Sequence, residues 1–293
     1  MPAWAANWLK MEGLGVNLNI LMWPILLQLH LIPAALYAGL GLYFWRTSPA
    51  ASGKLLPGMA HFERVLLVLA ILAHGFALYA AIFPGGEMRF GFSTALSFAV
   101  WLAICFYWVE AMYSHLDGLR AIVLPVGVLA CVLAAFFPAN HVLSDENTVS
   151  PVFRAHFIIA MLAYGLFMLA ALYAMLMAMA TKQLHHARFS RVLANLPPLL
   201  TMEAQLFRLI GIAFVLLTLT LLTGIIFTDT SFRFDHKRVF AAISWLLFGI
   251  LLIGRHFRGW RGRVALRWTL AGFIALMLAY VGSRFVIEVL LQR

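Results

Sequence analysis

Residues 153–180 read FRAHFIIAMLAYGLFMLAALYAMLMAMA, and after Arg154 this stretch contains no charged residue. A helix that crosses a bilayer needs about 20 consecutive, mostly apolar residues, because each residue advances ~1.5 Å through a hydrocarbon layer of ~30 Å. The stretch exceeds that length. It therefore predicts a transmembrane helix that is long enough to tilt or to project from the bilayer.

Seven further stretches have the same apolar character, at residues 18–45, 64–83, 92–109, 120–138, 206–227, 238–255 and 264–290. The chain is 64% hydrophobic and 11% charged, with a mean hydropathy of +0.94. Soluble domains carry roughly 25% charged residues. We therefore predict an all-α, polytopic membrane helix bundle of about eight transmembrane helices. Residues 1–293 would form a single membrane domain surrounded by membrane lipid.

The positive charges indicate a membrane topology rather than a nucleic-acid partner. The formal net charge is +10, and most Lys and Arg residues lie in short loops between the apolar stretches. The loops after the first, third, fifth and seventh stretches carry more of them, and cytoplasmic loops are the basic ones in membrane proteins. We therefore expect a bacterial inner-membrane protein with both termini outside, in the periplasm, and no binding to nucleic acid.

The sequence lacks the motifs of soluble enzymes and of thiol chemistry. Cys105 and Cys131 lie inside apolar stretches, and there is no CxxC, phosphate-binding loop, GxSxG or HExxH motif. This pattern argues against hydrolase, transferase and thiol-redox activity. It predicts neither a catalytic residue nor a metal site.

Histidine is the residue type that points to chemistry. His30 and His74 lie near the middle of the first and second stretches and reach a similar depth from opposite directions. Two imidazoles at one depth on neighbouring helices can ligate a haem iron from both of its faces. They can equally form hydrogen bonds with a backbone carbonyl or with a Ser or Thr side chain. Ionisable residues inside the membrane are functional candidates, so both interpretations stay open.

Three more histidines lie at the predicted outer face. His156 is just inside the fifth stretch, His236 opens the seventh beside Asp235, and His141 lies in the loop between the fourth and fifth. An outer histidine beside an apolar shelf can coordinate haem or a metal. It can also be an ordinary solvated residue at the membrane interface.

Several motifs of the second half resemble those of a known family: AYG at 163–165, LPP at 196–198, GWRGR at 259–263, AGF at 271–273 and YVGS at 280–283. They resemble the cytochrome c assembly membrane proteins, a haem-handling superfamily of the CcsA and CcmC type. The whole chain is most similar to the YpjD branch of that superfamily. The resemblance covers nearly all of the chain and is strongest from about residue 150 to residue 293.

The resemblance implies an aromatic platform for haem on the outer face. In the family, a tryptophan-rich segment that ends in WxWDP forms this platform. The matching segment here, residues 232–236, reads FRFDH. Asp235 is kept, Phe232 and Phe234 stand in place of the two tryptophans, and His236 stands in place of the proline.

The resemblance also implies which histidines would hold haem. His156 matches the first outer ligand, and His74, with His30 as a companion, matches the ligand within the membrane. The second outer ligand would fall near residues 291–293, where the sequence has no histidine, and His236 is a candidate substitute. The expected cofactor is haem, and the expected partners are other subunits of cytochrome c biogenesis.

Three functions are compatible with these features. The first is a haem-binding, haem-handling inner-membrane protein of the cytochrome c biogenesis type. The second is a non-haem accessory protein that modulates a transporter, for instance one for divalent metal ions, and the altered platform favours it. The third is an electron-transfer protein with haem b held by two histidines, which requires His30 and His74 to face each other.

Overall fold

The structure is a computed structural model, and it describes residues 18–47, 59–84, 88–113, 117–139, 142–143, 150–185, 198–226 and 236–291. The predicted platform residues Phe232, Phe234 and Asp235, together with His141, lie outside these ranges. All statements below concern the described part of the chain.

The described chain is built from helices in the order the sequence predicts. They are α2 (Leu18–Thr47), α3 (His61–Ile82), α4 (Phe92–Tyr113), α5 (Arg120–Phe136), α7 (Pro151–His185), α8 (Leu199–Ile226), α9 (His236–Arg258), α10 (Gly262–Met277) and α11 (Ser283–Phe285). Short 3-10 or π-helical turns, Asp117–Leu119, Leu278–Gly282 and Val286–Leu290, precede α5 and flank α11.

The prediction of an all-α bundle is confirmed. Seven helices are long and apolar enough to cross a membrane, and α5 is a shorter apolar helix of 17 residues that contains Pro125. The last span runs from Gly262 to Leu290, because the π-helical turns continue α10 and α11 as one rod. Each predicted stretch therefore corresponds to a helix, with ends that differ by a few residues.

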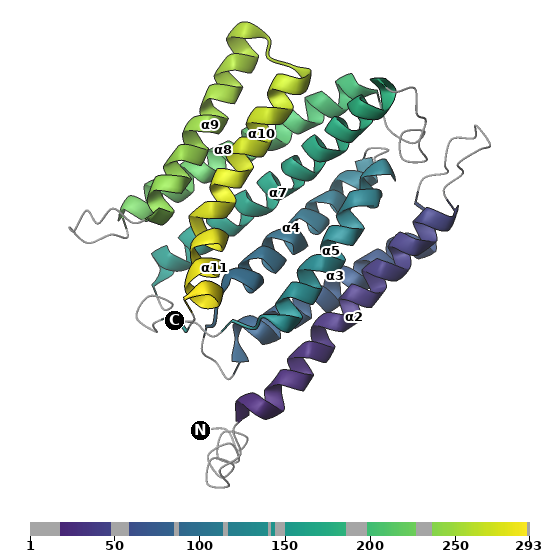
Figure 1. The fold of residues 1–293 in the computed structure, drawn as a ribbon, viewed down its shortest axis with the longest axis vertical. Coiled ribbons are helices and arrows are strands. Elements are labelled where there is room, and N and C mark those ends of the chain that lie inside the picture. Colours follow the sequence, from purple (N-terminus) through teal and green to yellow (C-terminus); the bar gives the residue numbers. More distant parts are fainter. Residues whose placement is uncertain are drawn as a thin grey trace.

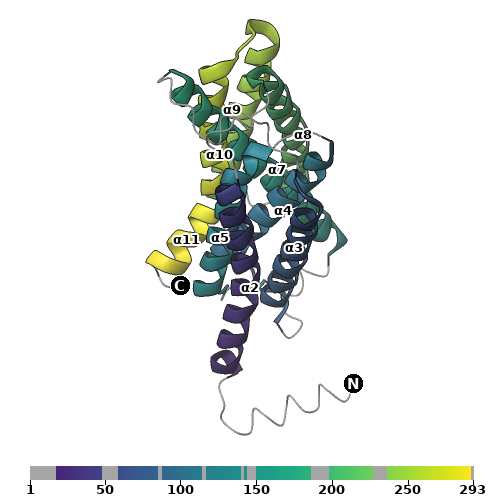
Figure 2. The same ribbon diagram turned by 90° about the vertical axis from the view of Figure 1, so that its right-hand side faces the viewer.

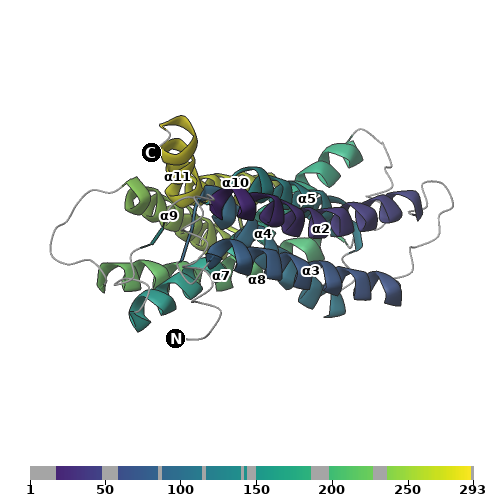
Figure 3. The same cartoon turned by 90° about the horizontal axis from the view of Figure 1, so that it is seen from below.

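The helices form two groups that meet at α4 and α7. In the first group, α3 and α5 pack on α4, and α2 packs on α3 and α5. In the second group, α8 and α10 pack on α7, and α9 packs on both α8 and α10. Figure 1 shows α9 along one edge of the bundle and α2 along the other. Figures 2 and 3 agree that α2, α5 and α10 lie on one side and α3 and α8 on the opposite side. Helices α7 and α4 are the most enclosed, with 78% and 56% of their apolar windows buried.

The two ends of the bundle differ in chemistry. Helix α2 begins and α11 ends at the same end, which we call the terminal end (Figure 1). At this end, polar contacts with the backbone connect neighbouring segments. A β-bridge pairs Arg89 with Val142, and the Ser93 hydroxyl donates to the carbonyl of Phe137. The other end, which carries the α9–α10 turn and which we call the turn end, holds the ion pairs.

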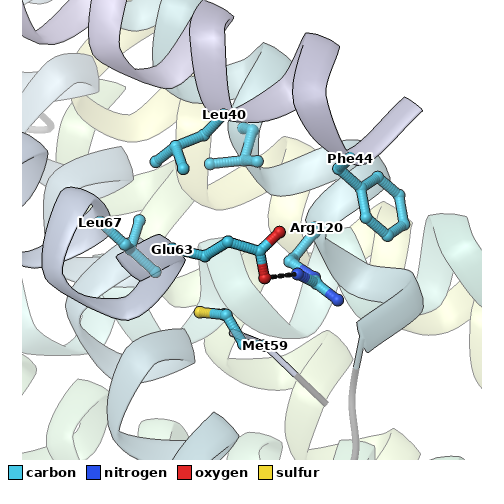
Figure 4. Close-up of a pocket in the computed structure, with 7 residues that line it drawn as sticks. Leu40, Phe44, Met59, Glu63, Leu67 and Arg120 are labelled. Carbon is cyan, nitrogen blue, oxygen red and sulfur yellow. Dashed lines mark hydrogen bonds and ion pairs between the residues drawn. The ribbon is translucent and has the colours of Figure 1, made fainter. Parts of the chain in front are cut away.

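A buried ion pair closes the turn end of the first helix group. The Arg120 guanidinium on α5 donates to the Glu63 carboxylate on α3 at 3.0 Å, and the two side chains are only 6% and 10% exposed. The backbone N–H of Ala60 donates to the same carboxylate oxygen at 2.8 Å, and the guanidinium lies 4.7 Å from the ring centre of Phe44 on α2. Figure 4 shows Leu40, Met59 and Leu67 around this pair. One charged contact therefore fixes α2, α3 and α5 to one another.

Two further carboxylates fix the second group. The Glu203 carboxylate on α8 accepts from Arg255 on α9 at 2.6 Å and lies 3.2 Å from Nε of Arg261. The Glu110 carboxylate on α4 accepts from Arg208 on α8 at 3.0 Å. Glu63, Glu110 and Glu203 are thus each paired with an arginine from another helix.

Candidate functional site

His74 lies in the middle of α3, inside the first helix group. Its side chain is 0% exposed. Its Nε2 atom is hydrogen-bonded to Oγ of Ser97 on α4 at 2.9 Å, and its Nδ1 atom to the hydroxyl of Tyr37 on α2 at 3.3 Å. Both ring nitrogens therefore have a neighbouring hydroxyl, which joins three helices through one imidazole.

His30 lies on the same face of α2 as Tyr37, two helical turns earlier. Both residues are buried, at 2% and 0% exposure. Helix α2, which carries both residues, packs against α3, which carries His74. The two intramembrane histidines that the sequence singled out therefore lie on neighbouring helices of the first group.

Tight packing between α3 and α4 encloses His74. The indole Nε1 of Trp101 donates to the carbonyl of Ile71 at 2.9 Å. A Cβ atom at Gly75 would lie 3.0 Å from the Trp101 ring, which leaves no room between the helices there. The imidazole chemistry of His74 suits a haem iron. The closed packing does not, because a porphyrin at His74 would need α3 and α4 to separate and Ser97 or Tyr37 to leave the ring.

His156 lies in the second turn of α7, near the terminal end, and faces α8. Its Nδ1 atom is 2.9 Å from Oγ1 of Thr223. The hydroxyl proton of Thr223 is already donated to the backbone carbonyls of Leu219, at 2.8 Å, and Thr220, at 3.1 Å. The Thr223 side chain thus contacts its own helix and Nδ1 of His156 together, which fixes the orientation of the imidazole ring against α8.

An imidazole that is oriented in this way suits an iron or metal ligand. Ligating histidines commonly donate one ring N–H to an oxygen, which fixes the ring orientation and leaves the other nitrogen to bind. His156 is half-buried and lies beside Gly224, where a Cβ atom would be 3.4 Å from the ring atom Cε1. The residues around His156 thus fit an imidazole ligand near the terminal end of the bundle.

Aromatic rings gather on the helices next to His156. Phe153 and Phe157, one helical turn apart on α7, have ring centres 6.2 Å apart. Phe157 also contacts the rings of Phe90 at 5.0 Å and Phe98 at 6.3 Å, and Phe90 contacts Tyr280 at 5.7 Å. We call these five residues the aromatic cluster; it joins α7 to α4 and to the end of α10.

The remaining predicted site residues lie apart or outside the described chain. His236 begins α9, as predicted, and its side chain is exposed. Phe232, Phe234 and Asp235, which precede it, fall outside the described residues. His156 packs against α8, whereas His30 and His74 lie among α2, α3 and α4. In the described chain no group of three or more His, Cys, Asp or Glu residues is placed to hold a metal ion.

Sequence reasoning missed the hydroxyl partners of these histidines. Ser97, Tyr37 and Thr223 lie in apolar stretches, where a lone hydroxyl is unremarkable. One signal was present for Tyr37, because positions 30 and 37 fall on the same face of a helix. Ser97 and Thr223 lie on other helices, so their contacts depend on how the helices pack.

The chain matches the family model described as cytochrome C assembly protein over residues 33–291. It is 32% identical over 234 residues to the inner membrane protein YpjD of Escherichia coli strain K12, covering 78% of this chain and 88% of the relative. It is 28% identical over 284 residues to an uncharacterized 28.8 kDa protein of Azospirillum brasilense, covering 89% and 94%.

A shorter part of the chain is similar to a protein that is named for cytochrome c biogenesis. It is 39% identical over 83 residues to the cytochrome c biogenesis protein CcsA of Prochlorococcus marinus strain MIT 9515, which is 27% of each chain. No solved structure matches the chain significantly. The family match spans both helix groups and includes His74 and His156. This polytopic membrane protein therefore belongs to the cytochrome c assembly protein family.

Proposed function

We propose that the protein binds and handles haem in the bacterial inner membrane as part of cytochrome c biogenesis. One observation carries the proposal: in a chain of the cytochrome c assembly family, the imidazole of half-buried His156 is oriented through Nδ1 by the Thr223 hydroxyl, near the terminal end of the bundle. The name of the CcsA relative and the name of YpjD, an inner membrane protein, support the process and the location.

In this proposal His156 is the outer haem ligand, and the terminal end is the periplasmic side. Thr223 orients the imidazole, and the aromatic cluster supplies an apolar wall beside it. The segment with Phe232, Phe234 and Asp235 is the aromatic platform by resemblance, and His236 at the start of α9 is the candidate second ligand. Haem, when bound, is the group that the biogenesis process attaches to apocytochromes, and this chain would retain it and present it to other subunits.

His30 and His74 support a second, intramembrane role. Both histidines are buried and lie on the neighbouring helices α2 and α3, which supports a bis-histidine haem b site as a second candidate. In the closed structure the hydroxyls of Ser97 and Tyr37 occupy the two nitrogens of His74. We therefore propose His74, with His30, as ligands only of a state in which α3 and α4 have moved apart.

The test is an absorption spectrum of the detergent-purified protein after expression with ample haem, oxidised and then reduced with dithionite. We expect a Soret band that is lost or strongly shifted in His156→Ala and kept in His74→Ala. Loss of the Soret band in His74→Ala alone would assign haem to the intramembrane histidines instead. A colourless protein that co-purifies with a transporter would overturn the haem proposal and favour the transporter-accessory function.

A further inference from the structure

A basic groove lies at the turn end of the bundle, far along α7 and α10 from His156. It has a volume of about 390 Å³ and lies between the last turns of α7 and the first turns of α10. Three cations line it, Lys182 from α7 and Arg263 and Arg267 from α10. None of the described residues that line the groove is acidic.

The α9–α10 turn holds the two arginines in place. Gly259 and Gly262 have φ angles of +62° and +56°, a left-handed backbone conformation that favours glycine. Arg261, between them, is anchored on the Glu203 carboxylate at 3.2 Å. Arg263 follows this turn directly, and Arg267 is one helical turn further, so both project on the same side of α10. The GWRGR motif therefore builds one wall of the groove.

The deeper wall of the groove is apolar. Leu266 and Leu270 on α10, and Ala178 on α7, line it together with the cations. Helix α10 begins at the turn end and α7 ends there, so Ala178 and Leu270 lie closer to the middle of the bilayer than the charges on their own helices, and Leu266 lies between Arg263 and Arg267. The groove thus combines positive charge at the membrane surface with an apolar slot below it.

We propose that this groove binds an anionic phospholipid of the leaflet at the turn end. The phosphate lies among Lys182, Arg263 and Arg267, and an acyl chain lies along Leu266 and Leu270. Basic pockets between transmembrane helices are suited to anionic head groups, and guanidinium groups form paired hydrogen bonds with phosphate oxygens. A soluble phosphate would contact the same cations but would gain nothing from the apolar wall. The site is independent of the proposed haem function.

Native mass spectrometry of the full chain in a neutral detergent tests this directly. The protein is offered equimolar phosphatidylglycerol and phosphatidylcholine with identical acyl chains. We expect preferential retention of phosphatidylglycerol. The triple variant Lys182→Gln, Arg263→Gln, Arg267→Gln should lose at least about tenfold of that preference, because each basic residue near a membrane surface contributes about fivefold.

The matched control removes the same charge from other exposed arginines at the turn end, with Arg46→Gln, Arg64→Gln and Arg258→Gln. It should keep the preference of the unaltered protein. Equal loss in both triple variants would overturn the proposal in favour of general charge attraction. Displacement of phosphatidylglycerol by millimolar inorganic phosphate would overturn it in favour of a soluble anion. Absence of any preference in the unaltered protein would overturn it without reliance on a variant.

Discussion

The two histidine regions hold their imidazoles in opposite ways. His74 is fully enclosed in the middle of α3, with Ser97 and Tyr37 at its two nitrogens. His156 is half-buried near the terminal end, and its Nδ1 atom contacts the Thr223 hydroxyl. The first ring is fully enclosed between three helices, whereas the second lies at the partly exposed contact between α7 and α8.

This difference shows that the role of a histidine inside a membrane helix can be inferred only when its neighbouring side chains are known. A buried ring whose nitrogens both have partners stabilises helix packing, because loss of either partner leaves a polar atom unsatisfied. A half-buried ring that is oriented through one nitrogen is the arrangement found at many haem and metal ligands. In the closed structure, His74 is therefore best described as a packing element, and His156 is the residue that we propose as a ligand.

The largest expected effect comes from the ion pair that closes the region of His74. Glu63→Ala leaves the Arg120 guanidinium buried without its carboxylate, and breaking a buried pair from one side costs about 3–5 kcal/mol. We expect the free energy of unfolding, measured by denaturation in mixed micelles, to fall by this amount. Because this pair lies at the turn end, any haem bound at His156 should keep its absorption spectrum in the protein that remains folded.

Glu110→Ala is the matched control. Its partner Arg208 is 64% exposed, so removal of the carboxylate does not leave a buried guanidinium without a partner. Such half-exposed pairs contribute only about 0–1 kcal/mol. Equal losses for the two variants would contradict the view that the first region is closed by a buried charge.

A smaller effect is expected when Thr223, which orients His156, loses its hydroxyl. Thr223→Val keeps the shape of the side chain and deletes the oxygen that is hydrogen-bonded to Nδ1. Loss of such a supporting hydrogen bond typically lowers metal affinity about 10–100-fold. Titration of the protein with haem, followed at the Soret band, measures the change.

Thr218→Val, on the same helix, is the control for that titration. The Thr218 hydroxyl accepts from the indole of Trp245 on α9, so its loss affects packing between α8 and α9. We expect haem affinity to stay as in the unaltered protein. An unchanged affinity in Thr223→Val would show that Thr223 does not prepare His156 for binding.

Ser97→Ala tests whether His74 is a packing element. The substitution leaves Nε2 of a fully buried ring without its hydroxyl partner, which costs about 1–3 kcal/mol. We expect a loss of thermal stability of that order and no change in the haem spectrum. A new or stronger Soret band in this variant would show the reverse, that Ser97 keeps a ligand position at His74 closed.

The fold was largely predictable from the sequence because each span is a local property. Length and the absence of charge mark 153–180 as a helix whatever surrounds it, and α7 follows that stretch closely. The contacts of the site are not local. Glu63 and Arg120 are 57 positions apart, and His156 and Thr223 are 67 apart. Such pairs depend on which helices become neighbours, and apolar periodicity does not specify this when lipid and protein are equally apolar.

The smallest expected effect concerns the space beside His156. In Gly224→Ala the new Cβ would lie 3.4 Å from Cε1 of the ring, close to an ordinary contact. We expect haem affinity to change by less than about twofold, and stability to rise by up to ~1 kcal/mol, because alanine favours a helix over glycine. Gly224→Val places methyl groups beyond that Cβ and should displace the ring from Thr223, with a loss of affinity similar to that of Thr223→Val. If alanine already lowers the affinity as much as valine, the ring tolerates no displacement at all, and His156 is held as tightly as His74.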